Sequence, residues 1–214
     1  MTPAQLLDVF RALVRDEAEP YLWPDAEVFA YMDDAQTMFC RLVGGIPDSR
    51  SPLCWVPYQA GDETVLYDRR ILKIRRVERD DKRPVCVIND EDLQFRSAPR
   101  SGRGELCQVV AGDDQNTLRL IDAPAFNGML HLHVLRLPLN EIVDETSELE
   151  IDRIHHLHLR DWMAALAYNK QDAETYDKTK ALEFEARFRQ YCDQVKWEQE
   201  RREHKPRLVS YGGI

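Results

Sequence analysis

The sequence predicts an α+β protein in which a bundle of N- and C-terminal helices carries an inserted antiparallel β domain, of sandwich or barrel type, and an extended C-terminal tail. Three observations lead to this prediction. Apolar residues recur every three or four positions near both ends, form short β-rich runs in the middle, and reappear in a brief segment after a charged stretch at the C-terminus. The chain therefore divides into residues 1–50, 51–138, 139–204 and 205–214.

The first division predicts two helices. Apolar side chains line one face of residues 4–18, and Pro20 ends that helix. The second helix starts near Pro24, which suits a first helical position, and ends at the pair Gly44-Gly45. Its apolar residues share a single face, so both helices are expected to pack in one bundle.

The second division is rich in Val, Ile, Leu and Tyr, with Gly, Asp, Asn and Pro between the apolar runs. This pattern is typical of antiparallel strands joined by tight turns. We expect strands at residues 53–58, 64–67, 71–77, 85–88, 106–111, 117–121 and 129–137.

The third division predicts a helical hairpin. Ser147 and Glu150 have the spacing of a capping box, so we expect a helix to begin there and to run to about Asn169. Asp172 is the expected cap of the last helix. Core positions are expected at Trp162, Phe184 and Phe188.

The C-terminus changes character twice. Residues 196–207 are polar on all sides, which predicts a helix that leaves the core. The following apolar, β-favouring residues would be awkward to expose on a monomer, so we expect the tail to dock on another subunit. The docking residues predicted here are Lys205, Arg207, Leu208, Val209, Tyr211 and Ile214.

Composition limits the class of function. The 38 acidic residues outnumber the 29 basic ones, which gives a net charge of −9 and disfavours tight DNA binding. One basic loop, with Arg96, Arg100 and Arg103, is a candidate contact for a partner. No apolar stretch is long enough for a membrane span and no leader is evident, which predicts an intracellular protein without membrane association. The five cysteines are expected to be reduced and buried.

Catalytic and nucleotide-binding motifs are absent from the sequence, which predicts a protein that is not an enzyme and has no cofactor or metal. One alternative is a metal-dependent hydrolase built on His131 and His133, which share one face of a strand, and a helical histidine among His155, His156 and His158. Ordinary structural roles for these histidines are the favoured interpretation. Acidic pairs such as Asp33-Asp34 are expected to lie in turns or on solvated faces.

Three stretches are similar to one known family. They are residues 25–41 (DAEVFAYMDDAQTMFCR), residues 158–192 (HLRDWMAALAYNKQDAETYDKTKALEFEARFRQYC) and the terminal HKPRLVSYGGI. All three resemble the head-to-tail adaptor, or connector, proteins of tailed bacteriophages. These proteins share the layout of a helical bundle, a β region and a C-terminal tail.

The resemblance implies a virion structural protein, made in the host cytoplasm, that forms a homo-oligomeric ring of about twelve copies in the neck. Such a ring joins the portal to tail and nozzle proteins, and DNA passes non-specifically through its lumen during genome ejection. On this resemblance the last helix and the tail engage the portal or a neighbouring subunit, and the β domain faces outward. The other interpretation left open is an oligomeric virion or assembly protein outside the neck.

Overall fold

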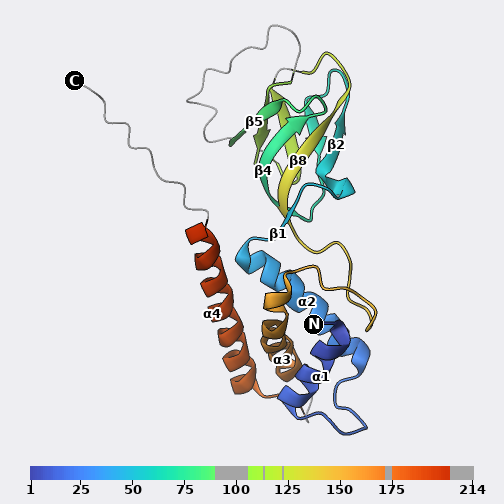
Figure 1. Ribbon diagram of the computed structural model, residues 1–214, viewed down its shortest axis with the longest axis vertical. Coiled ribbons are helices and arrows are strands. Elements are labelled where there is room, and N and C mark those ends of the chain that lie inside the picture. The colour runs from blue at the N-terminus through green and yellow to red at the C-terminus, as the bar shows by residue number, and fades with distance from the viewer. Residues whose placement is uncertain (90–105, 113, 122, 172–174, 203–214) are drawn as a thin grey trace, which may run out of the picture. The chain divides into compact units, whose positions relative to one another are not determined.

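The computed structural model describes residues 1–89, 106–112, 114–121, 123–171 and 175–202 (Figure 1). It confirms a mixed α+β protein, with four α-helices and a curled β-sheet among these residues. The chain forms two compact units. The helical unit comprises Met1–Val43 and Glu141–Ile214, and the β unit comprises Gly44–Asn140.

Helix α1 spans Pro3–Val14 and begins with a capping box: the Thr2 hydroxyl accepts a hydrogen bond from the backbone N–H of Gln5 (3.3 Å), and the Gln5 side chain accepts one from the backbone N–H of Thr2 (3.0 Å). The helix is shorter than predicted because Arg15 adopts a left-handed conformation (φ 61°). Pro20 therefore does not end the helix.

The connection from α1 to the next helix is organised by a buried ion pair between Arg11 and Asp16. The Arg11 guanidinium donates to Asp16 Oδ2 (2.9 Å) and to the Trp23 carbonyl (3.2 Å). Asp16 also accepts hydrogen bonds from the backbone N–H groups of Leu22 and Trp23 (2.9 and 3.3 Å). The helix therefore ends before its predicted last turn, because Asp16 is buried and binds the backbone of the connecting loop.

Helix α2 spans Asp25–Val43, close to the predicted bounds. The Pro24 carbonyl accepts hydrogen bonds from the N–H groups of Glu27 and Val28 (2.9 and 3.1 Å). At the other end Gly44 has φ +113°, a conformation that glycine adopts without strain.

The predicted capping box at Ser147 and Glu150 is wrong. The Ser147 hydroxyl accepts hydrogen bonds from the N–H groups of Val143 and Asp144 (3.2 and 3.3 Å), so it closes a turn. The Glu150 N–H donates to the side chain of Gln36 on α2 (2.6 Å). Helical structure begins only with the short 3-10 helix η3, Arg153–His158, and helix α3, Leu159–Asn169.

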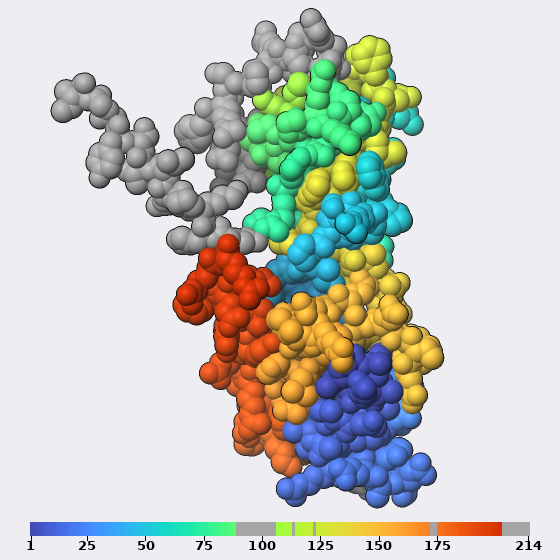
Figure 2. Space-filling model, viewed as in Figure 1, coloured from blue at the N-terminus to red at the C-terminus, as the bar shows by residue number. Residues whose placement is uncertain are grey.

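Helix α4 spans Lys178–Arg202, and its surface runs as one continuous orange-to-red column in Figure 2. Asp177 Oδ1 accepts hydrogen bonds from the N–H groups of Thr179 and Lys180 (3.1 Å each), which places the cap at this residue. The predicted cap, Asp172, lies outside the described residues.

Helices α3 and α4 pack through aromatic side chains. Trp162 and Phe188 lie with ring centroids 5.3 Å apart, and both are buried, as predicted. Phe184 stacks on Tyr168 at 5.9 Å but is only half-buried, so its predicted core role is wrong in part.

The acidic pair on α2 holds other segments of the helical unit, contrary to the prediction of a solvated face. Asp33 accepts a hydrogen bond from the backbone N–H of Ile142 (3.0 Å), and Asp34 accepts one from the indole N–H of Trp162 (2.7 Å). Burial raises the pKa of Asp33, against the effect of the hydrogen bond from Ile142.

The β unit contains eight strands among its described residues. In sheet order β1-β8-β4-β5-β6-β7-β3 they form one curled sheet, and β2 also pairs with β8 (Figure 1). Their bounds are β1 Ile46–Asp48, β2 Trp55–Tyr58, β3 Thr64–Leu66, β4 Ile71–Arg79, β5 Pro84–Asn89, β6 Gln108–Ala111, β7 Thr117–Ile121 and β8 Gly128–Arg136, with a 3-10 turn at Pro52–Cys54.

The seven predicted strands are present, six of them with shifted ends, and β1 was not predicted because it has three residues and no periodic pattern. The antiparallel prediction is wrong for one pair, since β5 and β6 run parallel with Cys86 opposite Gln108. Residues 90–107 separate these strands in sequence, which is long enough for the crossover that a parallel pair requires.

Alternation along β8 separates the two faces of the sheet. Leu130, Leu132 and Val134 are buried in the core, so His131 and His133 project from the opposite face. The core also takes Cys54 from the 3-10 turn, Leu106 from the segment before β6, and the following side chains from the other strands: Val56, Tyr58, Val65, Ile71, Val77, Val85, Val109, Leu118 and Leu120.

All five cysteines lie in the described part of the chain, and none forms a disulfide there. Cys40, Cys54 and Cys192 are buried as predicted, and burial raises the pKa of Cys192 to about 12. Cys86 and Cys107 are exposed, contrary to the prediction. The strand alternation explains Cys86, because its neighbour Val85 takes the inward position.

Candidate functional site

The residues predicted to contact partners lie outside the described part of the chain. They are the tail residues Lys205, Arg207, Leu208, Val209, Tyr211 and Ile214, and the loop residues Arg96, Arg100 and Arg103. The described residues present two other features with functional potential. One is the exposed end of α4, and the other is a polar cluster on the outer face of the β-sheet.

The end of α4 leaves the core, as predicted. Val195 is its last buried residue, and every residue from Lys196 to Arg202 is exposed. The exposed Trp197 ring lies under the guanidinium of Arg201, 4.6 Å from ring centroid to carbon. The last turns of α4, between its packed part and the tail, therefore present charged side chains and one aromatic ring.

The polar cluster on the sheet, here called the outer ladder, consists of Trp55, Arg76, Glu78, His131 and His133. Strand pairing sets its order: His131 on β8 lies opposite Trp55 on β2 and opposite Glu78 on β4. His133 lies opposite Arg76 on β4. Five side chains from three strands thus meet on one face as direct cross-strand neighbours.

His131 is held on two sides. Its ring stacks on the Trp55 indole, with centroids 4.0 Å apart and planes 7° apart. Its Nε2 lies 2.6 Å from the carbonyl oxygen of Ser49. Its Nδ1 faces Glu78 Oε2 at 3.9 Å, and the ring centroid of His133 lies 4.8 Å away.

Glu78 is a buried carboxylate, with 8% of its surface exposed, and it forms an ion pair with Arg76 through Oε1. Its Oε2 lies 3.7 Å from His133 Nε2. Burial lowers the pKa of His133, and the nearby His131 and Arg76 lower it further. All three effects disfavour the protonated His133 ring.

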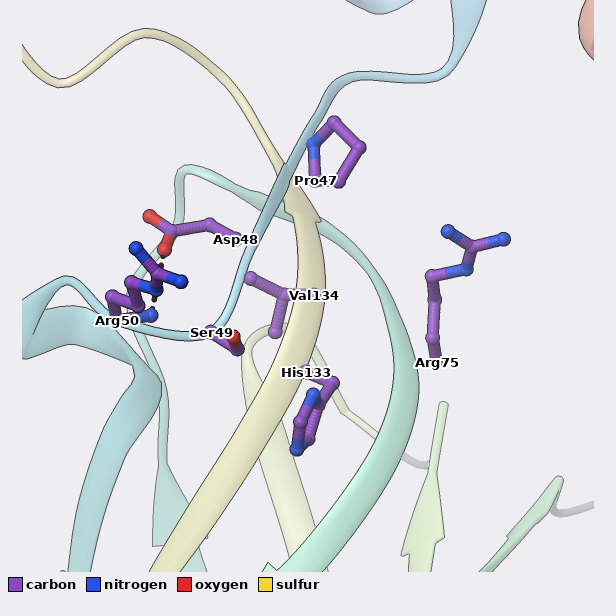
Figure 3. A pocket seen from close by; sticks show the side chains of 7 residues that line it. All are labelled: Pro47, Asp48, Ser49, Arg50, Arg75, His133 and Val134. Atoms are coloured by element: carbon purple, nitrogen blue, oxygen red, sulfur yellow. Dashed lines mark hydrogen bonds between the residues drawn. The ribbon is translucent and has the colours of Figure 1, made fainter.

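An open depression of about 390 Å³ borders His133 (Figure 3). Its lining residues are Pro47, Asp48, Ser49, Arg50, Arg75, His133 and Val134. Asp48 anchors this wall, because it accepts hydrogen bonds from the Arg50 N–H (2.8 Å) and from Arg136 Nε (2.5 Å). Burial would raise the pKa of Asp48, but the hydrogen bonds from Ser51, Arg50 and Arg136 lower it well below its usual range.

The helical histidines have partners within the helical unit. His155 Nδ1 lies 2.8 Å from the Tyr191 hydroxyl, and His158 stacks on the Tyr191 ring at 3.5 Å. His156 is buried, with its two ring nitrogens each 2.9 Å from a backbone carbonyl oxygen. Among the described residues, the group with metal-ligand spacing joins His131 and His133 to Glu78, without a helical histidine.

Comparison with known proteins decides the family. The family model described as SU10 adaptor protein matches residues 1–210. The chain belongs to the SU10 adaptor protein family. This match extends the resemblance to phage head-to-tail adaptors from three stretches to almost the whole sequence. A comparison with curated proteins finds no match.

As a member of the SU10 adaptor family, the chain is a phage structural adaptor protein. Within its described residues, no helix has the length and apolar character needed to cross a bilayer. The family match gives no role to the outer ladder, whose side chains lie outside the sheet core.

Two of the five ladder residues were candidates from the sequence. His131 and His133 were visible as a pair at alternate positions of a strand. Glu78 is the single acidic residue in a run of basic residues, 73–79, and Trp55 has no recognisable signal in the sequence. The pairing of β4 and β2 with β8 brings them to the histidines, and that pairing is not encoded in any local spacing.

Proposed function

We propose that this protein forms a ring of about twelve copies in the neck of a tailed phage virion, where it joins the portal to the tail and nozzle proteins. The single observation that carries the proposal is the family match over residues 1–210. The protein acts through contact surfaces and not through catalysis. Its helical segments, residues 1–50 and 139–204, form the body of the ring, and the β domain, residues 51–138, faces outward.

DNA passes through the lumen of this ring without being held. The net charge of −9 on each chain supports this role, because a ring of like chains repels the phosphate backbone. The loop with Arg96, Arg100 and Arg103 is basic, unlike the chain as a whole, and it contacts an acidic surface of a tail protein. Most of the acidic residues then face the channel or the solvent.

The C-terminal tail docks on the portal or on the adjacent subunit. The exposed last turns of α4, Lys196 to Arg202, support this proposal because they carry the chain away from its own core. Beyond them, Leu208, Val209, Tyr211 and Ile214 supply apolar and β-favouring side chains. Addition of such a segment to a sheet edge uses backbone hydrogen bonds and needs a partner with an unpaired strand.

Deletion of residues 208–214 tests this docking. We expect the shortened protein to keep its far-ultraviolet circular dichroism spectrum and to lose binding to its portal, or ring formation, by at least about tenfold in affinity, because the apolar contact area is gone. Light scattering and co-sedimentation with purified portal measure both properties. The matched control replaces Arg96, Arg100 and Arg103 by alanine, which should leave portal binding intact. Portal binding and ring formation that both survive the deletion unchanged would contradict the docking role of the tail.

A further inference from the structure

The outer ladder places three metal-ligating atoms together. His131, His133 and Glu78 each offer one ligand atom, and these atoms all lie within 4.8 Å of one another. Bonds of about 2.0–2.1 Å to a tetrahedral zinc ion put neighbouring ligand atoms about 3.3 Å apart. Glu78 Oε2 lies 3.9 Å from His131 Nδ1 and 3.7 Å from His133 Nε2, so both distances are longer than this spacing. A small rotation of the side chains is enough to close the difference.

The hydrogen bond of His131 fixes which nitrogen faces the cluster. The Ser49 carbonyl oxygen only accepts, so Nε2 of His131 at 2.6 Å is the donor. In the neutral ring Nδ1 then presents its lone pair to the Glu78 carboxylate. A backbone carbonyl that holds the far N–H of an imidazole is the arrangement that orients metal-bound histidines.

His133 supplies an independent observation. Its Nε2 is shielded from solvent and has no hydrogen-bond partner within the described part of the chain, although it points at Glu78 Oε2. A buried polar atom without a partner is uncommon in folded proteins. A cation between this nitrogen, Nδ1 of His131 and the carboxylate would satisfy all three acceptors at once.

The surroundings hold the ligands in place. Stacking on Trp55 fixes the plane of the His131 ring. The ion pair with Arg76 occupies Oε1 of Glu78 and leaves Oε2 directed at the histidines. Two imidazoles and one carboxylate suit zinc or a similar transition metal better than magnesium or calcium, which prefer oxygen ligands. The open depression beside His133 leaves room for water as a further ligand.

We propose that Glu78, His131 and His133 bind one divalent transition-metal ion, with Zn²⁺ as the best-fitting ion, and that this ion clamps β8 to β4. The clamp acts on the strand that organises the β unit, because β1, β2 and β4 all pair with β8. Its role is structural: it fixes the outer face of the sheet. This site departs from the expectation of no metal, and it differs from the alternative metal site in containing no helical histidine.

The test uses the full chain, freed of metal with a chelator, and Co²⁺ as a spectroscopic probe before Zn²⁺. We expect one equivalent of Co²⁺ to give visible ligand-field bands without a thiolate charge-transfer band, which would mark binding at the exposed Cys86 or Cys107 instead. Zn²⁺ should displace the cobalt and raise the Tm of the protein. Calorimetry gives the Zn²⁺ affinity.

His133→Ala and Glu78→Gln are the test variants, and His158→Ala is the matched control, because His158 lies in the helical unit and stacks on Tyr191. We expect each test variant to weaken Zn²⁺ binding at least about a hundredfold and to lose the rise in Tm, while the control keeps both. His133 is 34% exposed in its side chain, so its alanine variant should fold. Zn²⁺ binding that is absent, or equal in the wild type and both test variants, would overturn the proposal.

Discussion

Replacement of Phe188 by alanine is expected to lower the free energy of unfolding by about 3–5 kcal/mol. Phe188 is 0% exposed, and it packs its ring against Trp162 at the interface of α3 and α4. Alanine would leave a cavity between two helices whose backbones are held by many other contacts, so the site cannot collapse to fill it. Denaturant unfolding followed by circular dichroism measures the change.

Leu182→Ala is the control for this variant. Leu182 lies on the same helix and is 56% exposed, so its loss should change the unfolding free energy by no more than about 0.5 kcal/mol. Similar costs for the two variants would show that α4 does not pack through Phe188. The packing of α4 against α3 described above would then be wrong.

Replacement of Asp48 by alanine is expected to destabilise the protein by about 3–5 kcal/mol. The Asp48 and Arg136 side chains form an ion pair at 2.5 Å, with only 9% and 10% of their surfaces exposed. Removing the carboxylate breaks this buried ion pair beside β1. The backbone N–H groups of Arg50 and Ser51 lose their acceptor at the same time.

An exposed pair in the same unit is the control. Asp68 and Arg70 also form an ion pair, at 2.7 Å, but their side chains are 28% and 45% exposed. Asp68→Ala should therefore cost no more than about 1 kcal/mol, since surface ion pairs contribute little. A cost for Asp48→Ala as small as that of the control would contradict the buried pair.

The pH dependence of stability follows from the same carboxylate. The pKa of Asp48 is lowered in the folded protein, so its stabilisation is complete above the unfolded pKa of about 3.9 and is lost as the pH falls through the folded value. The difference in unfolding free energy between the wild type and Asp48→Asn should consequently shrink as the pH falls below about 4. If the difference in unfolding free energy stays constant over that range, the hydrogen bonds from Ser51, Arg50 and Arg136 do not stabilise the ionised Asp48 carboxylate.

Local signals in the sequence predicted the elements that depend on local physics. Pro24 and the glycine after Val43 set the limits of α2, because a proline favours a helix start and a glycine tolerates the left-handed turn at its end. Strand β7 has its predicted bounds, Thr117–Ile121, since alternation and flanking turns both mark it. These features need no knowledge of distant residues.

Features that depend on contacts between distant residues were not predictable in the same way. Ser147 has the spacing of a helix cap, but Gln36, far away in the sequence, accepts the hydrogen bond of the Glu150 N–H, and the helix starts later. Glu78 reads as one acidic residue in a basic run until β4 pairs with β8. Tertiary pairing decides these positions, and a single sequence gives no register.

The same division holds for function. The layout of helical ends, β region and tail was sufficient to indicate a phage adaptor, and the match over residues 1–210 confirms the family. The tail and the basic loop stay predictions, because they lie outside the described residues. The outer ladder was invisible as a unit, since its five residues come from three strands.

The most direct test of the proposed adaptor role is the mass of the purified full chain, alone and mixed with its portal, by native mass spectrometry. A ring adaptor predicts an assembly of about twelve chains, either free or bound to the portal. A single chain in both conditions would contradict the role of this protein as the ring that joins the portal to the tail.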